Sequence, residues 1–355
     1  MAGVTMQASA TTLWPELIGA VGLLAVLAYA VLAGADFGAG VWDLLAYGPR
    51  AGARRRAIAE AMGPVWEANH VWLIFVIVLL FSCFPSAYAA LSVAFFVPFH
   101  LILVGVILRG ASFVFRAHGR EAAGTSLGWG RVFGIASAVT PLLLGACLGA
   151  LSAGHVRVEE GAVLAGSTLA WLRPFPIVTG FLALAVCAYL AAVYLTIETE
   201  GQPEVQADFR RRALWVWCIA GALSVAAIAV AAVDAPRLWG RLTAAPAAGA
   251  LLAGALLAPA SGAAMWRRRY AIARVLAVGQ VVVLLSGWAL AQWPYIIYPD
   301  VTLHGAAAPV ASLRAVALTL PFGLGLLLPS LWLLFAVFKG RNPAPASGTI
   351  TTAAP

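Results

Sequence analysis

Charged side chains are scarce in this sequence, and lysine is nearly missing. Only 10% of the 355 residues are charged, 63% are hydrophobic, and Lys339 is the single lysine among 22 basic residues. A soluble domain carries about 25% charged residues, so the composition predicts a polytopic membrane protein. The net charge of +8 does not indicate a nucleic-acid partner, because arginines that flank membrane segments explain it better.

Paired cysteines and a basic N-terminal region are also missing. The cysteines stand singly without a C-x-x-C motif, which predicts neither a metal site nor a disulfide framework: Cys83, Cys147, Cys187 and Cys218. No basic residue precedes the first apolar run, so we expect that run to be retained rather than cleaved as a signal peptide. Residues 1–340 are predicted to form one integral membrane domain, and the Pro/Ala/Thr-rich residues 341–355 a disordered tail.

Nine segments are long and apolar enough to span a bilayer, which needs about 20 residues. With nine all-α spans and the N-terminus outside, seventeen basic residues fall on the cytoplasmic side, together with the C-terminus, and five on the other side. The predicted spans are 13–35 (with an extension towards Trp42), 62–82, 86–108, 131–153, 174–196, 213–233, 245–265, 270–291 and 313–338.

A weak internal similarity links the first and fifth spans. The stretch "LAVLAYAVLAGADFGAG" resembles "LALAVCAYLAAVYLTIE". A duplication would give two four-helix bundles, within 13–153 and 174–291, plus an extra helix at 313–338. Chance similarity between Ala/Leu-rich helices is the alternative.

Three carboxylates lie in or beside apolar spans: Asp36 in "GADFGAG", Asp43, and Glu67 in "GPVWEANHVW". A charge at the bilayer centre costs about 2.5–3.5 kcal/mol on insertion scales. Glu60 and His70 would share a helical face with Glu67, although Gly63-Pro64 interrupts that helix. Glycines around Asp36 allow close helix approach, so this acid could adjoin a water-filled gap and pass protons.

Structural explanations of the same residues stay open. Asp36 and Asp43 could cap a turn at the inner membrane surface, and Glu67 could reach water there. Trp66 and Trp72 are typical of an interfacial aromatic belt.

The histidines bear on haem binding. His70 and His100 lie within spans, and two such histidines could clamp a haem. Without a second pair at helical spacing, single packed histidines are the better interpretation.

Several motifs together resemble a known family. In chain order they are "GADFGAG", "GPVWEANHVWLI", "RGASFVFR", "TEG" and "WPYIIYPDVTLHGAAAP", and they resemble the signatures of subunit II of cytochrome bd-type quinol oxidases. The distinctive block is P-x-W-[DE]-x-N-x-V-W, read here as Pro64, Trp66, Glu67, Asn69, Val71 and Trp72.

This resemblance implies a heterodimer in the bacterial cytoplasmic membrane that oxidises quinol and reduces dioxygen. Subunit I would carry the b and d haems, and subunit II would bind none itself; a structural quinone and small accessory subunits stay open. The resemblance places Glu67 and Asp36 on a cytoplasmic proton path, with Glu60, His70 and Asp43 as weaker candidates. Two arginines, Arg109 and Arg116, are expected at the inner surface, where they would hold the subunit.

Two departures from the family pattern stand out. Val114 occupies a position in "RGASFVFR" where many members have a carboxylate, and His304-Gly305 replaces an aromatic-acid pair. Two alternative functions are a proton-coupled transporter and a purely structural scaffold of the oxidase.

Overall fold

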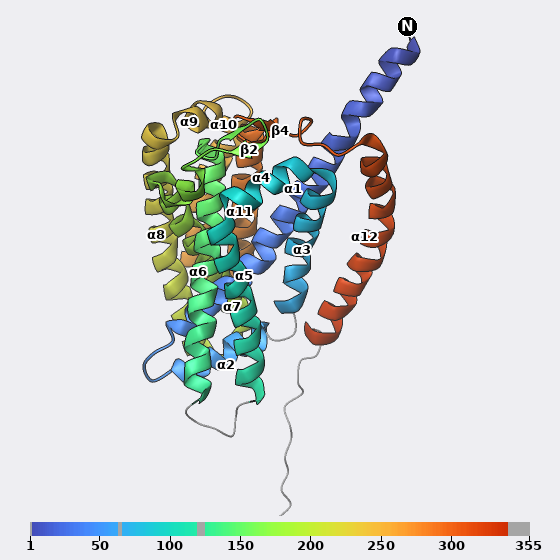
Figure 1. Ribbon diagram of the computed structural model, residues 1–355. Helices are drawn as coiled ribbons and strands as arrows, with labels where there is room; N and C mark the ends of the chain where they lie inside the picture. The colour runs from blue at the N-terminus through green and yellow to red at the C-terminus, as the bar shows by residue number, and fades with distance from the viewer. Residues whose placement is uncertain (1, 63–65, 119–124, 340–355) are drawn as a thin grey trace, which may run out of the picture.

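The computed structural model describes residues 2–62, 66–118 and 125–339, and nearly all of them are helical (Figure 1). Two short antiparallel hairpins, β1–β2 and β3–β4, lie in the connections. The elements are α1 (Ala2–Leu44), α2 (Ala51–Met62), α3 (Trp66–Cys83), α4 (Pro85–Ala94), α5 (Phe96–His118), α6 (Thr125–Ala153), β1 (Val158–Glu159), β2 (Ala162–Val163), the 3₁₀-helix η1 (Ser167–Leu172), α7 (Pro174–Glu198), α8 (Pro203–Asp234), α9 (Pro236–Leu242), α10 (Ala247–Trp266), α11 (Tyr270–Gln292), β3 (Tyr295–Ile297), β4 (Val301–Thr302) and α12 (Val310–Lys339).

Eight helices in the described ranges are long and apolar enough to cross a membrane, and a ninth crossing is made if α3 and α4 count as one bent span. This agrees with the predicted polytopic all-α fold. The α3 and α4 axes differ by 119°, because Phe84 precedes Pro85 and leaves the helical conformation at φ −135° and ψ 58°.

The predicted third span, 86–108, is wrong in its first half. Residues 85–94 form α4, which lies across the end of the bundle, and the crossing helix α5 starts at Phe96 (Figure 1). Apolarity could not reveal this break, since both helices are apolar and the chain turns at Phe95 without a polar residue.

The connections separate by charge. Figure 1 shows α2 at one end of the molecule, and α4, α9 and both hairpins at the other. The arginine-rich segments lie in α2, around the start of α8 and between α10 and α11, at the same end as α2. We call it the basic end.

Glycine permits the close packing of α1 on its neighbours. A Cβ at Gly38 would collide with the backbone oxygen of Cys187 on α7, and one at Gly40 with Ser137 on α6. The predicted close approach around Asp36 is therefore confirmed. The largest buried cluster surrounds this contact and joins α1, α2, α7, α8, α10 and α11.

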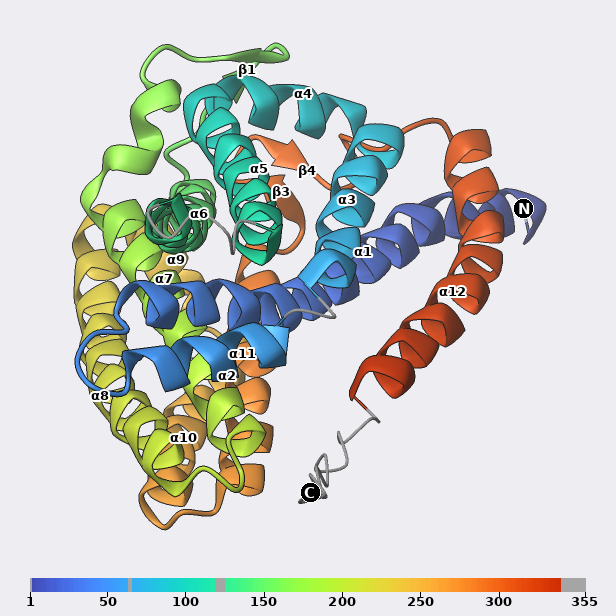
Figure 2. The same cartoon turned by 90° about the horizontal axis from the view of Figure 1, so that it is seen from below.

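Helix α12 stands apart from the other helices. Figures 1 and 2 show it along one side of the molecule, and it contacts α1 and α3. Its most apolar window has no buried residue, so its side chains face the surroundings of the subunit. The duplication of 13–153 in 174–291 stays a prediction.

Candidate functional site

A buried ion pair joins α1 to α5. The Nη2 atom of Arg109 lies 2.5 Å from Oδ1 of Asp36, and the two side chains are 1% and 0% exposed. A buried charge without a partner costs several kcal/mol, so each side chain makes the burial of the other tolerable. Asp36 lies eight residues before the end of α1, which is about 12 Å along the axis, and it therefore does not cap the following turn.

The Arg109 guanidinium is enclosed by further partners. Its Nε donates to Oγ of Ser137 at 3.1 Å, and its Nη2 donates to the Asp36 carbonyl at 3.2 Å. The rings of Phe37 and Phe133 lie 5.0 and 5.1 Å from the guanidinium carbon, within the range of cation–π attraction. Arg109 is therefore a fixed internal cation.

The same cation lies beside the ring of His70. Nη1 of Arg109 lies 3.4 Å from Nε2 of His70. A guanidinium can only donate, so a hydrogen bond across this contact requires Nε2 to be unprotonated. His70 also packs its ring against Tyr29 and Phe37.

A small, largely apolar cavity lies against α1 near this cluster. It has a volume of about 70 Å³, and its polar lining comes from Asn69, Tyr194 and Glu198. Asn69 is buried and its amide lies 3.5 Å from the carbonyl of Leu32 on α1. The volume is enough for a water molecule, and three polar groups could bind it.

The other predicted acids lie in different surroundings. Asp43 is buried next to the end of α1, whereas Glu60 is exposed on α2. The side chains of Trp66, Glu67 and Arg116 lie outside the described residues, so the Glu60–Glu67–His70 alignment stays a prediction.

Arg109 is enclosed by the protein. Its side chain is 1% exposed because it lies between helices and pairs with an acid. Its expected position at the inner membrane surface stays a prediction, because burial between helices does not give the depth of a residue in a bilayer. Ser137, Tyr194 and Glu198 were not predicted, because only packing brings α6 and α7 beside Asp36.

The remaining candidates are dispersed. His100 is exposed on α5 and its Nδ1 lies 2.7 Å from the carbonyl of Phe96, while Trp72 is half-buried on α3. In the described ranges no group of three or more histidine, cysteine or acidic residues could hold a metal ion.

Two acid–base contacts organise the hairpin end. Asp300 accepts hydrogen bonds from Arg157 at 2.8 Å and from the Val158 amide at 2.8 Å. Burial raises the pKa of Asp300, but these hydrogen bonds outweigh it and leave that pKa below its usual value. His304, the second departure from the family pattern, lies 3.7 Å from Glu16.

His155 lies at the same end, with Nε2 at 2.9 Å from the Asp234 carbonyl and 3.6 Å from its carboxylate. Burial lowers the pKa of His155. These contacts tie the loops to α8.

The fold and this cluster define a class of protein: a multi-pass helical membrane protein with an internal ion pair near a small cavity. The chain belongs to the cytochrome bd terminal oxidase subunit II family, whose sequence model matches residues 14–338. The family predicted from the sequence motifs is thereby confirmed.

Individual relatives agree with this assignment. Subunit 2 of the cytochrome bd-I ubiquinol oxidase of Escherichia coli K12 is 30% identical over 194 residues, which cover 54% of this chain and 49% of that protein. The chain thus matches about half the length of this relative. A putative cytochrome bd menaquinol oxidase subunit II of Bacillus subtilis is 25% identical and aligns over 88% of this chain and 92% of its own length.

The solved structure of bd oxidase from Geobacillus thermodenitrificans contains a chain with the same fold. The TM-score is 0.74 at 23% identity, and the match covers 92% of this chain and 99% of that one. The similarity extends the shared architecture to nearly the whole chain.

Proposed function

We propose that this chain is the haem-free subunit II of a cytochrome bd-type quinol:oxygen oxidoreductase in the bacterial cytoplasmic membrane. It works with a subunit I that carries the haems, and it contributes part of the proton path from the cytoplasm. The observation that carries the proton role is the internal Asp36–Arg109–His70 cluster beside a cavity with room for water.

The cavity supplies the path into the membrane. Glu198 is exposed at the end of α7, and Asn69 lies buried at the other side of the cavity. Water held between them would carry protons from the basic end towards His70 and Asp36. The charge bias supports placing this end in the cytoplasm, since arginine favours the cytoplasmic side.

The two histidines predicted within spans, His70 and His100, are poorly placed for haem. Nε2 of His70 faces a guanidinium at 3.4 Å, which repels a metal cation, and His100 is exposed with Nδ1 at the Phe96 carbonyl. This supports the proposal that the haems belong to the partner subunit.

The visible spectrum of a tagged form purified from native membranes tests the assembly. Bands of b- and d-type haem that co-purify in fixed proportion to the chain support the oxidase. A colourless protein that transports a solute by itself supports the proton-coupled transporter instead.

Replacement of cavity residues tests the proton role. Asn69→Leu should slow both oxygen consumption and proton uptake from the basic end when the complex is reconstituted in liposomes, with haem content unchanged. Ser330→Ala on the exposed face of α12 is the matched control. Full turnover in both Asn69→Leu and Glu198→Gln would contradict the proton role and support a purely structural scaffold.

A further inference from the structure

An open groove at the basic end is not used by the proposed proton path. It lies where the start of α8 meets the end of α10, and its volume is about 700 Å³. Its charged rim comes from three arginines and two acids, and its apolar wall includes Trp215, Cys218 and Trp266. The charged residues are Arg50, Arg210, Arg211, Glu204 and Asp208.

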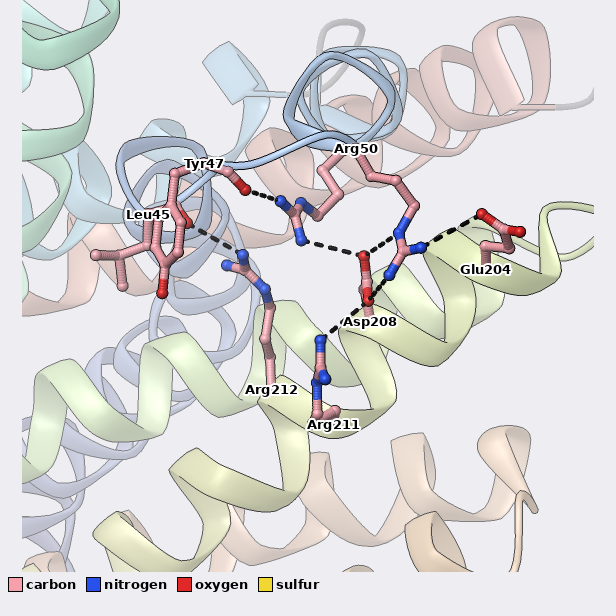
Figure 3. Close-up of polar contacts among 8 residues, drawn as sticks. Leu45, Tyr47, Arg50, Glu204, Asp208, Arg211 and Arg212 are labelled. Carbon is pink, nitrogen blue, oxygen red and sulfur yellow. Dashed lines mark hydrogen bonds and ion pairs between the residues drawn. The ribbon is translucent and has the colours of Figure 1, made fainter.

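Arginines surround a single buried acid at the rim (Figure 3). Asp208 accepts from Arg50 at 2.9 and 3.0 Å, from Arg54 at 3.1 Å and from Arg211 at 3.2 Å. Three cations thus share one carboxylate, and Glu204 adds a weaker contact to Arg50 at 3.4 Å. Arg50, Arg54 and Arg211 are thus held in place by two carboxylates, and the cluster keeps a net positive charge.

Two further arginines, both on α8, contact carbonyl groups. Arg210 donates to the carbonyls of Met265 and Trp266, and Arg212 donates to the carbonyl of Leu45. Arg210 also lines the groove and adds to its positive charge, whereas Arg212 does not line it. Arg211 is 69% exposed and has one described contact, so most of its five donors can reach a ligand.

The groove changes from cationic to apolar along α8. Ala207, Arg211, Trp215 and Cys218 follow one another at helical spacing on one face. Position 218 lies eleven residues beyond position 207, which is about 16 Å along the helix axis. Trp215 and Trp266 are 68% and 69% exposed, as is typical of tryptophan at the membrane–water interface.

We propose that this groove binds an anionic phospholipid, with the phosphate at Arg50 and Arg211 and the glycerol and acyl chains along Trp215 and Trp266. Arginine forms bidentate hydrogen bonds to phosphate, and basic pockets beside membrane helices bind anionic headgroups. Free phosphate could bind the same arginines, but it has no apolar part that would contact the tryptophans. The apolar wall therefore favours a lipid.

The test measures lipid binding by the intact complex purified from native membranes. Phosphatidylglycerol, phosphatidylcholine and inorganic phosphate are titrated separately, and bound species are counted by native mass spectrometry. Arg211→Gln should weaken phosphatidylglycerol binding about tenfold, as expected for one lost charge-assisted contact. The fold should survive, because Arg50 and Arg54 still neutralise Asp208.

Controls separate the sources of the signal. Arg269→Gln, an exposed arginine of the α10–α11 connection that does not line the groove, should bind phosphatidylglycerol normally. Trp215→Ala should weaken the binding of phosphatidylglycerol and leave any binding of inorganic phosphate unchanged.

Three results would overturn the proposal: equal lipid binding by Arg211→Gln and the parent, inorganic phosphate binding as tightly as the lipid, or a small protein subunit found in the groove. None of these readouts uses oxygen consumption, so the outcome is independent of the proposed oxidase activity.

Discussion

Arg109 pairs with Asp36 at 2.5 Å although 73 positions separate them in the chain. The pair links α5 to α1 inside the bundle, where neither charge reaches solvent. Each charge should therefore depend on the other for stability, and single and double substitutions can test this.

Asp36→Asn should strongly destabilise the subunit, by about 3–5 kcal/mol, because it leaves a buried arginine without a counter-charge. The melting temperature of the purified complex measures the loss. Asp36→Asn combined with Arg109→Gln removes both charges and should recover much of the stability. Additive losses in the double variant would show that the two side chains are not coupled.

Gly38→Ala should weaken the packing of α1 on α7, since the new methyl group meets the Cys187 carbonyl, a backbone atom that cannot rotate away. Overpacking of this kind costs about 1–3 kcal/mol. Thermal unfolding of the purified protein measures it. In Gly221→Ala nothing lies within 4 Å of the added Cβ, so this control should be as stable as the parent. A Gly38→Ala protein of parental stability would contradict the close contact.

Glu67→Gln should slow oxygen consumption by the complex roughly tenfold or more, because a positioned proton-transfer group contributes about 100-fold or more. Haem content and assembly should be unchanged, as measured by the visible spectrum and by gel filtration. Glu159→Gln, an exposed acid of β1 at the hairpin end, is the control and should retain its rate. Unaltered turnover in Glu67→Gln would argue for a scaffold.

His155→Gln should remove a pH dependence of stability at the hairpin end. Burial lowers the pKa of His155 in the folded protein, although Asp234 opposes this and Arg173 adds to it. As pH falls below about 6.5, the unfolded chain binds a proton that the folded chain resists, so the parent loses stability between neutral pH and the lowered folded pKa.

Melting temperatures at pH 7.5 and 5.5 measure this effect. The drop on acidification should be smaller in His155→Gln than in the parent. An identical drop in both proteins would assign the pH dependence to other groups.

Composition and spacing alone established the membrane class, nearly all the crossing helices and the charge difference between the two ends. These features follow from local physics, because apolar length and flanking arginine act without reference to distant residues. The motif around Glu67 likewise predicted the family, since it is a short, contiguous pattern.

Only the tertiary structure decided which charges are internal. Arg109 lies beside Asp36, Ser137 and His70, and these four residues belong to four different helices. The turn at Phe84–Pro85 and the groove between α8 and α10 were equally hidden in the sequence. The reason is physical: a linear pattern records hydrophobicity along one helix, whereas a buried ion pair or a groove depends on how neighbouring helices approach one another.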